Sequence, residues 1–311
     1  MSIIAGLPPW VVLDPMLKSW LVEDIGRGDR STNSLHIGEV PFGQAEWVAK
    51  APGAIAGLPV ARRIFYILDD RITFEAAVGE GDWCEPGRVV ARIEGPIDAL
   101  LMGERVALNL TMRLSGIATM TRRYVEKIAD LPVQLVDTRK TTPGLRLLEK
   151  YASRAGGARN HRMGLDDAVM LKDNHIAAIG SIKEAIARVR SEIPYPLTIE
   201  VETETLADVK AALESGADII MLDNMSPEQM RAGVQIIRQQ SDRIKIEASG
   251  NITLETVRPV AETGVDYIST SAPITRSSWL DLSMKLGDRS YNSNSSNRLN
   301  PEKSLGLEKA P

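Results

Sequence analysis

The chain of 311 residues has only one cysteine, Cys84, and no long hydrophobic run. A single thiol excludes an internal disulfide and a cysteine-rich zinc site, which is typical of a reducing compartment. No apolar run approaches the roughly 18 residues of a membrane-spanning helix. The first residues, MSIIAGLPPWVV, include prolines and no basic segment, so they do not resemble a secretory signal. These absences predict a cytoplasmic protein with no membrane partner.

The composition is otherwise that of an ordinary globular protein, with 43% hydrophobic and 25% charged residues. A chain of this length can form one large core or a large and a small one, and we expect two domains. The formal net charge is -4. Because an acidic chain lacks a diffuse basic surface, no nucleic-acid partner is expected.

Positive charge is nevertheless concentrated between residues 137 and 175, which also include two of the three histidines. Eight basic residues lie there: Arg139, Lys140, Arg146, Lys150, Arg154, Arg159, Arg162 and Lys172. Such a local concentration in an acidic chain indicates a binding site for an anion.

The pattern of this stretch predicts a strand, a helix, a loop and a second strand. VQLVD, residues 133–137, is apolar enough for a short buried strand, and AVMLK, residues 168–172, for another. Thr142 followed by Pro143 predicts a helix start, and RNHR at 159–162 then falls in a loop. Arg139, Lys140, Arg162 and Lys172 therefore lie at or just beyond strand ends, where α/β proteins place their chemistry.

Other polar residues in this stretch have simpler interpretations. Arg146, Lys150 and Arg154 recur every four residues, which predicts a solvent-facing stripe on one helix. His175 is expected to be structural. For His161, a hydrogen bond within the loop and a contact to a phosphate remain equally open.

The residues before this stretch predict a small α+β domain over 1–115. Residues 10–25 have the pattern of a helix, and residues 44–95 alternate short strands and turns around one helix. The long helical region that opens at Pro96 is expected to break into two helices at Gly116. Within this region Arg105 lies beside Glu104, which indicates that Arg105 is a solvent-exposed charged residue.

Residues 116–286 predict a second domain built from repeated strand–helix units. Six apolar segments, counted from residue 133, are each followed by a helix or a polar loop. This alternation predicts parallel strands with right-handed crossovers, in an incomplete α/β barrel of about six strands. A doubly wound sheet is the alternative, but no glycine-rich dinucleotide motif follows the first strand. Residues 287–311 are rich in serine and asparagine and predict a disordered tail.

Polar groups close every strand of the predicted barrel and suit a phosphorylated sugar. Glu202 and Asp223 can bind sugar hydroxyls, or magnesium through water. The turns Ser249-Gly250-Asn251 and Thr270-Ser271-Ala272 can hold a phosphate with backbone N–H groups. Together with the four basic strand-end residues, they imply a ligand with several negative charges and a hydroxylated sugar.

Several segments, in the correct order over residues 10–286, closely resemble quinolinate phosphoribosyltransferase, the carboxylating nicotinate-nucleotide pyrophosphorylase of NAD biosynthesis. They are EDIGRGD, ERVALNLTMRLSGIAT, DTRKTTPGLRLLEKYA, GGARNHRMGLDDAVMLKDNHI, IEVET, ADIIMLDNM, IEASGNIT and TGVDYIST. Many ordered motifs make a chance match far less plausible than a single glycine motif does.

The resemblance implies an N-terminal α+β sandwich domain, an α/β barrel with fewer than eight strands, and a homodimer with its site shared between subunits. The implied substrates are quinolinate and 5-phosphoribosyl-1-pyrophosphate, with Mg²⁺ as the cofactor. The residues implied to bind quinolinate and the neighbouring phosphate are Arg105, Arg139, His161, Arg162 and Lys172. Those implied for the phosphoribosyl donor and magnesium are Lys140, Glu202, Asp223, Ser249, Gly250, Asn251, Thr270, Ser271 and Ala272. Thr138 is also implied to bind substrate. Among all of these, the implied catalytic residues are Lys140, Lys172, Glu202 and Asp223.

Two positions depart from the family pattern, which has Gly-Gly at Gly250-Asn251 and a glycine at Ser271. Three other functions stay open: a related phosphoribosyltransferase with another acceptor, a Schiff-base aldolase using Lys140 or Lys172, and a non-catalytic binding protein. RNHR and the set of arginines argue against another acceptor.

Overall fold

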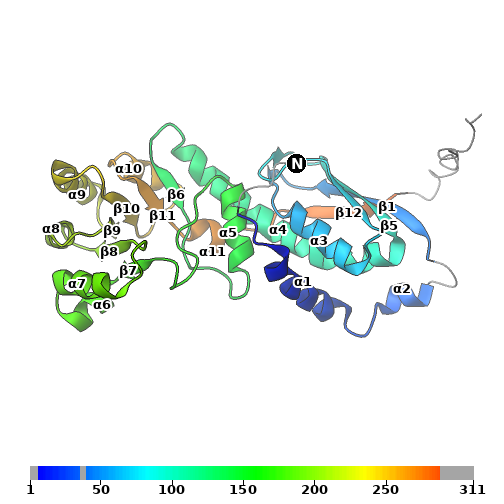
Figure 1. The fold of residues 1–311 in the computed structure, drawn as a ribbon. Coiled ribbons are helices and arrows are strands. Elements are labelled where there is room, and N and C mark those ends of the chain that lie inside the picture. Colours follow the sequence, from blue (N-terminus) through cyan, green and yellow to red (C-terminus); the bar gives the residue numbers. More distant parts are fainter. Residues whose placement is uncertain (1–5, 36–39, 288–311) are drawn as a thin grey trace, which may run out of the picture.

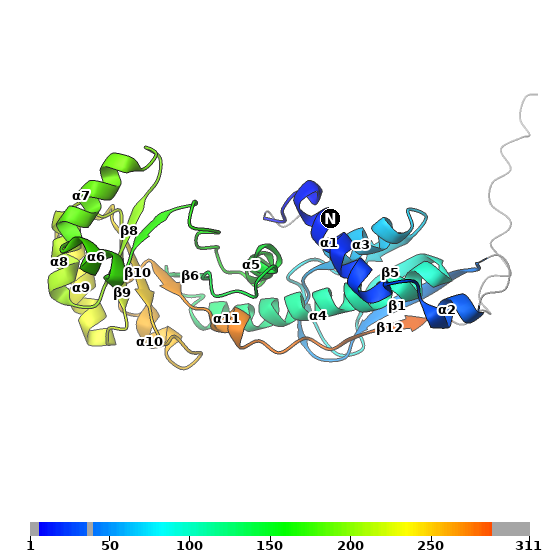
Figure 2. The same cartoon turned by 90° about the horizontal axis from the view of Figure 1, so that it is seen from below.

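The structure, a computed structural model, describes residues 6–35 and 40–287, which form an elongated molecule with two bodies (Figure 1). The predicted disordered tail lies, from residue 288 onward, outside the described residues. One 31-residue helix, α4 (Ile97–Lys127), extends along the long axis from the first body toward the second, as Figure 2 shows.

The first body is an antiparallel sheet with helices packed beside it, in strand order β12-β1-β5-β3. Its four strands are β1 (Phe42–Ala49), β3 (Thr73–Ala76), β5 (Val89–Pro96) and β12 (Leu282–Leu286). Beside them lie α1 (Trp10–Ile25), α2 (Arg30–Leu35), α3 (Leu58–Leu68) and a pair of short strands, β2 (Gly53–Ala54) and β4 (Trp83–Cys84). The predicted α+β architecture is confirmed.

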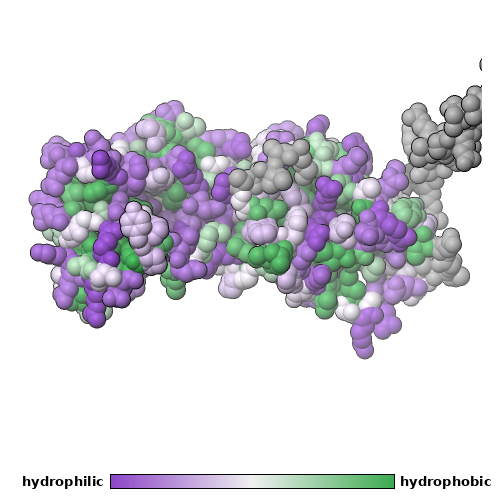
Figure 3. Space-filling model, in the orientation of Figure 1, coloured by the Kyte–Doolittle hydropathy of each residue, from purple (hydrophilic) through white to green (hydrophobic). Residues whose placement is uncertain are grey.

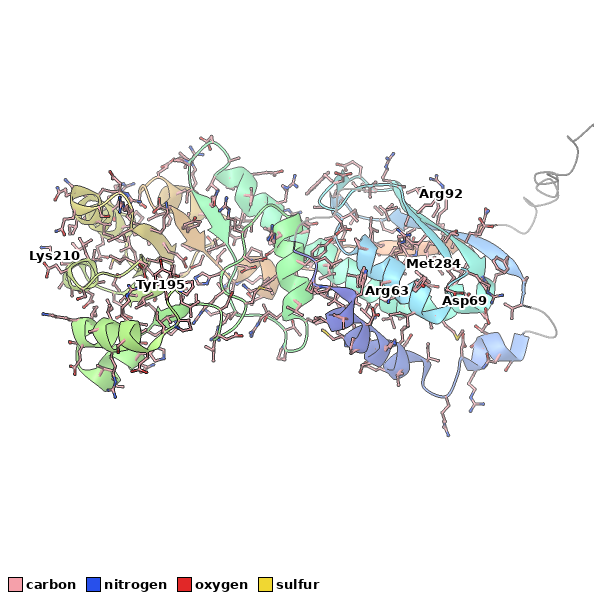
Figure 4. All side chains as sticks on the ribbon, viewed as in Figure 1. Arg63, Asp69, Arg92, Tyr195, Lys210 and Met284 are labelled. Carbon is pink, nitrogen blue, oxygen red and sulfur yellow. The ribbon has the colours of Figure 1, made fainter. Side chains whose placement is uncertain are left out.

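Aromatic residues hold the core of this body together. The fully buried ring of Trp47 meets Phe74 edge-on, with centroids 5.7 Å apart, and Phe65 of α3 lies 6.2 Å away. Such pairs contribute about 0.5–1.5 kcal/mol each beyond the burial of apolar area. Arg63, labelled in Figure 4, binds Asp14 at 2.5 Å and thereby ties α3 to α1.

Strand β12 changes the predicted domain division. Residues 282–286 fall in the predicted barrel segment, yet they pair with β1 in antiparallel register, Met284 opposite Trp47. Figure 4 accordingly shows Met284 in the first body, far from Tyr195 and Lys210 at the other end of the molecule. The chain therefore returns to its first sheet after completing the second body.

The predicted break at Gly116 is wrong, because α4 is continuous through it. A Cβ atom at this position would lie 2.0 Å from the carbonyl oxygen of Ser278. The glycine serves close packing of the returning chain against the helix rather than interruption of the helix.

The second body is a parallel sheet of six strands in the order β6-β11-β10-β9-β8-β7. The strands are β6 (Gln134–Val136), β7 (Val169–Leu171), β8 (Ile199–Thr203), β9 (Ile219–Asp223), β10 (Lys245–Ser249) and β11 (Tyr267–Ser269). The helices that follow these strands along the chain are α5 (Arg146–Ala155), α6 (Asp173–Ile179), α7 (Ile182–Glu192), α8 (Leu206–Glu214), α9 (Pro227–Gln240), α10 (Val257–Ala261) and α11 (Ala272–Thr275). The buried face of α5 packs in the core of the first body.

This order confirms the incomplete barrel and rules out the doubly wound alternative. From β7 to β11 each strand pairs with the next in sequence, whereas a doubly wound sheet reverses its strand order at an internal switch point. No ladder among the described residues joins β6 to β7, so the barrel stays open there.

The surface is mixed, with hydrophilic residues and scattered hydrophobic patches on the face shown in Figure 3. Within residues 6–35 and 40–287, no helix has both the length and the apolar character that crossing a bilayer requires.

Candidate active site

The carboxyl ends of the six parallel strands meet at one pocket with a volume of about 560 Å³. Parallel strands place these ends on the same edge, so residues distant in sequence are brought together there. Fourteen of the fifteen predicted site residues line it: Thr138, Arg139, Lys140, His161, Arg162, Lys172, Glu202, Asp223, Ser249, Gly250, Asn251, Thr270, Ser271 and Ala272.

Arg105 is the predicted residue that this pocket does not include. It lies on α4, its side chain is 59% exposed, and its guanidinium lies 3.6 Å from the carboxylate of Glu104. Within one chain, Arg105 is therefore a surface residue.

The two-residue repeat of the strands explains which side chains reach the pocket. Glu200 and Glu202 are two positions apart on β8, so they point to the same face. Glu247 and Ser249 have the same relationship on β10. Glu200 and Glu247 lie one layer deeper in the barrel and are almost fully buried.

A cluster of His161, Glu200 and Glu247 forms at this deeper layer. Nε2 of His161 lies 3.1 Å from Oε2 of Glu200 and 3.5 Å from Oε2 of Glu247. The other carboxylate oxygen of each glutamate is buried and has no hydrogen-bond partner among the described residues. Sequence analysis missed both glutamates, although IEVET and KIEAS each carry a charged residue inside a buried strand, which is costly unless it is paired.

The charge state of His161 follows from these contacts. Burial favours the neutral ring, but the two carboxylates outweigh it and raise the pKa of His161 to about 10. Nδ1 accepts a hydrogen bond from the backbone N–H of Arg162 at 2.7 Å, which also favours a neutral ring, but the two full negative charges outweigh this contact. Burial raises the pKa of Glu200, against the effect of its hydrogen bond with His161. Both shifts favour an additional proton in the cluster.

The backbone at His161 is held by an ion pair between Lys150 and Asp137. Asp137 accepts a hydrogen bond from the His161 backbone N–H at 2.9 Å, and Lys150 donates to the His161 carbonyl oxygen at the same distance. The predicted solvent-facing stripe is therefore wrong at Lys150, whose side chain is 0% exposed. Burial lowers the pKa of this ammonium group, and the charge of Asp137 opposes the effect.

A second buried carboxylate, Glu149, fixes the segment that follows β6. Glu149 accepts hydrogen bonds from the backbone N–H and the hydroxyl of Thr142, both at 2.8 Å, and it pairs with Arg113 at 2.7 Å. Thr142 is not the predicted N-cap, since α5 begins at Arg146. Thr142 instead anchors the turn that carries Arg139 and Lys140 into the pocket.

Two guanidinium groups lie close together on this side of the pocket. Burial lowers the pKa of Arg162, and the nearby positive charge of Arg139 adds to the effect. One Nη of Arg162 donates to the carbonyl oxygen of Ala168 at 2.9 Å, which orients the side chain. Such an arrangement of like charges is suited to a shared anionic ligand.

Lys172 and Glu202, from adjacent strand ends, form an ion pair of 2.5 Å. His175 is structural as predicted, since its Nδ1 accepts the Lys172 backbone N–H at 3.0 Å. Because the side-chain nitrogen of Lys172 is paired with a carboxylate, the site does not favour a Schiff-base lysine there.

The turns that follow β10 and β11 accommodate both departures from the family pattern. Gly250 and Asn251 have positive φ, 98° and 50°, a region that asparagine tolerates better than most residues. A Cβ at residue 250 would lie 2.2 Å from Oδ1 of Asn224, so glycine is required there. Ser271 has φ -87°, which does not call for glycine.

Few side chains in the described part of the chain are grouped closely enough to hold a metal ion. Only His161, Glu200 and Glu247 form a group of three or more such side chains close enough to share an ion. Glu202 and Asp223 offer two carboxylates at the pocket, which fits a hard cation whose other ligands are water and substrate oxygens. Arg276, Asn224 and Thr253 also line the pocket and were not predicted. Asn224 directly follows β9, so its strand-end position is a signal that could have indicated it.

Two family models together match most of the chain. The N-terminal domain of quinolinate phosphoribosyl transferase matches residues 29–115, and the C-terminal domain of the same family matches residues 117–285. Among curated proteins, a probable nicotinate-nucleotide pyrophosphorylase [carboxylating] from Synechocystis is 60% identical over 90% of this chain and 94% of its own. The nicotinate-nucleotide pyrophosphorylase [carboxylating] of Homo sapiens is 38% identical over 91% of this chain and 94% of its own.

Solved structures agree. NadC from Streptococcus pyogenes is 43% identical, with a TM-score of 0.86 over 90% of this chain and 98% of its own. The nicotinate-nucleotide pyrophosphorylase of Francisella tularensis is 32% identical, with a TM-score of 0.85 over 92% of this chain and 100% of its own. On the evidence of both domains, the long matches and the shared fold, this chain belongs to the quinolinate phosphoribosyltransferase family.

Proposed function

We propose that this chain transfers the phosphoribosyl group of 5-phosphoribosyl-1-pyrophosphate to quinolinate, in the de novo synthesis of NAD. The products are nicotinate mononucleotide, carbon dioxide and pyrophosphate. The observation that carries this proposal is the composition of one pocket. Cationic side chains for a dicarboxylate, carboxylates for sugar hydroxyls and two turns for a phosphate all line it.

The quinolinate subsite consists of Arg139, Arg162 and Lys172, with His161 beside them. Arginine can bind each carboxylate through two hydrogen bonds, and lysine contributes a compact positive charge. The His161 cluster lies behind Arg162, and its hydrogen bonds fix the Arg162 backbone. Cations that are oriented before the ligand arrives lose little freedom on binding.

The donor subsite is formed by the remaining residues of the pocket. Glu202 and Asp223 bind the ribose hydroxyls, and Lys140 faces the pyrophosphate. The Thr138 hydroxyl accepts the Lys140 backbone N–H at 3.0 Å and shapes that turn. The 5-phosphate is bound by the turns at 249–251 and 270–272, whose N–H groups suit an anion.

Magnesium is the proposed cofactor, and the oxygen donors of Glu202 and Asp223 fit it, directly or through water. When bound, magnesium supplies positive charge that offsets the charge of the pyrophosphate. The side chains themselves hold the ribose, orient the dicarboxylate ring and exclude water from the reacting atoms.

The reaction needs mainly charge and orientation from these residues. The C–O bond to pyrophosphate breaks as Lys140 stabilises the departing negative charge, and the pyridine nitrogen forms a bond to the anomeric carbon. The 2-carboxylate then leaves as carbon dioxide, and the electron pair of the broken C–C bond remains on C2. A proton from solvent then binds to C2 at the position that the carboxylate has left. The positive ring nitrogen stabilises that carbanion, so the protein needs to position the ring and desolvate the carboxylate.

We also propose that the chain acts as a cytoplasmic homodimer in which Arg105 completes the pocket of the partner subunit. The support is the position of Arg105, which is exposed and outside the pocket of its own chain. An exposed arginine that the family motif assigns to quinolinate suits a pocket completed across the dimer axis.

The test is incubation with quinolinate, the donor and magnesium, with nicotinate mononucleotide and carbon dioxide both measured. We expect equal amounts of the two products. Binding of both substrates without turnover would favour a binding protein, and turnover with another acceptor alone would favour a different phosphoribosyltransferase.

A further inference from the structure

Lys172 and Glu202 serve different substrates in the proposed function, yet they bind each other in this structure. Leu171, the last residue of β7, is opposite Val201 of β8, so Lys172 and Glu202, which follow them, lie at neighbouring positions on the pocket edge. The ammonium nitrogen of Lys172 lies 2.5 Å from Oε2 of Glu202. In this pair, Glu202 occupies the cation that quinolinate requires, and Lys172 occupies the carboxylate that the donor requires.

The pair is partly open to the pocket, which makes exchange for a ligand feasible. The Lys172 side chain is 44% exposed and that of Glu202 is 13% exposed, and both line the pocket. Exposed ion pairs contribute only modestly to stability, so a dicarboxylate that also meets two arginines can displace Glu202 from Lys172.

The neighbouring carboxylate, Asp223, provides an internal comparison. It also lies at a strand end in the pocket, but its carboxylate accepts a hydrogen bond from Asn224 at 2.7 Å and has no cationic partner among the described residues. Both acids add negative charge to the pocket, and only Glu202 occupies Lys172.

We propose that Glu202 occupies Lys172 when quinolinate is absent and that their ion pair couples the two substrate subsites. This inference rests on the proposed function. Quinolinate that binds Lys172 releases Glu202 to bind the donor, and a donor that binds Glu202 releases Lys172. Because coupling between binding sites is reciprocal, each substrate tightens the binding of the other.

The test is calorimetric titration with quinolinate alone, without donor or magnesium. In Glu202→Gln, Lys172 no longer has a charged partner, so the Kd for quinolinate should fall, by roughly three- to tenfold. Asp223→Asn is the matched control, because it removes the same charge from the same pocket. Its Kd should stay within about twofold of the wild-type value. Glu202→Ala should behave as Glu202→Gln does, and it serves if the glutamine variant does not fold.

The outcomes separate this inference from the proposed function. A wild-type protein that does not bind quinolinate contradicts the proposed function, and the coupling with it. A wild-type protein that binds, together with folded Glu202 variants that bind no tighter, overturns the coupling alone. Equal tightening in Asp223→Asn also overturns it, since general charge removal then accounts for the effect.

Discussion

The buried ammonium group of Lys150 pairs with the carboxylate of Asp137, and this pair supports the segment that carries His161 and Arg162. Asp137 also accepts hydrogen bonds from the Ser153 hydroxyl at 2.8 Å and from Asn160 at 2.6 Å. The pair therefore joins the end of β6, helix α5 and the loop after it into one unit beside the pocket.

Replacing Lys150 with methionine should destabilise the protein strongly. The change leaves Asp137 as a buried carboxylate without its cation, which typically costs about 3–5 kcal/mol. Denaturant unfolding followed by circular dichroism measures the loss. Arg154→Met is the control, since Arg154 is exposed one helical turn away and its loss should cost no more than about 0.5 kcal/mol. Similar losses in the two variants would show that Lys150 has no special support role.

Lys150 also shows where sequence reasoning stops. The four-residue spacing of Arg146, Lys150 and Arg154 is visible in the sequence, but periodicity does not say what the helix packs against. The burial of Lys150 depends on Asp137, which precedes it by thirteen residues and reaches it only in the folded chain. The continuity of α4 through Gly116 was also not predictable, because the reason for the glycine is a tertiary contact. The returning chain at Ser278 packs too close to α4 for any side chain at residue 116.

Strand ends, in contrast, were predictable from the sequence. A parallel strand must alternate with a crossover, and its carboxyl end must lie at the common edge, so Lys172, Glu202 and Asp223 could be placed together from their order alone. Glu200 and Glu247 are visible in the sequence as charged residues inside buried strands. Their partner could not be assigned, because their pairing with His161 brings together three segments far apart in sequence.

His161 should remain positively charged well above neutral pH. Its folded pKa of about 10 exceeds the unfolded value of about 6.5, so charged His161 contributes stability fully below pH 6.5. That contribution is lost as the pH rises through about 10. Two-dimensional NMR of the ring protons measures the midpoint, with His161→Gln identifying the signal among three histidines. A midpoint near 6.5 would contradict the carboxylate contacts.

The unfolding free energies of the wild type and His161→Gln should follow the same pH dependence. The stability advantage of the wild type should be largest near pH 6 and should shrink toward pH 10, because only the wild type loses a favourable charge. His175→Gln is the control for histidine replacement in general, since His175 lies outside the cluster. An advantage that stays constant with pH would contradict the assigned charge state.

Quinolinate should be preferred strongly over nicotinate, which lacks the 2-carboxylate. With nicotinate, a cation of the quinolinate subsite stays unpaired in a partly buried site, and such sites discriminate strongly. We expect kcat/KM to be lower by about a hundredfold or more. The measurement is formation of nicotinate mononucleotide without release of carbon dioxide. Comparable turnover with quinolinate and nicotinate would contradict the proposal that this subsite binds two carboxylates.

Asp223→Ala should impair binding of the donor with magnesium more than binding of free quinolinate. The reason is the position of Asp223 at the strand end beside Glu202, on the carboxylate side of the pocket. Separate calorimetric titrations with quinolinate, and with the donor and magnesium, test it. Arg139→Ala provides the reverse comparison, since its loss should weaken quinolinate more. Equal losses for both ligands in Asp223→Ala would contradict its role.

The proposed role of Arg105 across the dimer can be tested by mixing two inactive chains. Arg105→Ala and Lys172→Ala should each give a nearly inactive homodimer. In a mixed dimer, one pocket combines the intact Lys172 of one chain with the intact Arg105 of the other, and the second pocket lacks both. Random pairing makes half of the dimers mixed, so co-expression should restore about one quarter of the wild-type activity.

The alternative arrangement predicts a different result from the same mixture. If Arg105 served the barrel of its own chain, every pocket would carry one of the two substitutions, whichever chains were paired. No activity would then return, even with mixed dimers verified by two different affinity tags. Asp223→Ala in place of Arg105→Ala is the control, because Asp223 and Lys172 line the pocket of the same chain. Co-expression of Asp223→Ala with Lys172→Ala should restore no activity. If activity returns only when Lys172→Ala is paired with Arg105→Ala, the partner subunit supplies Arg105.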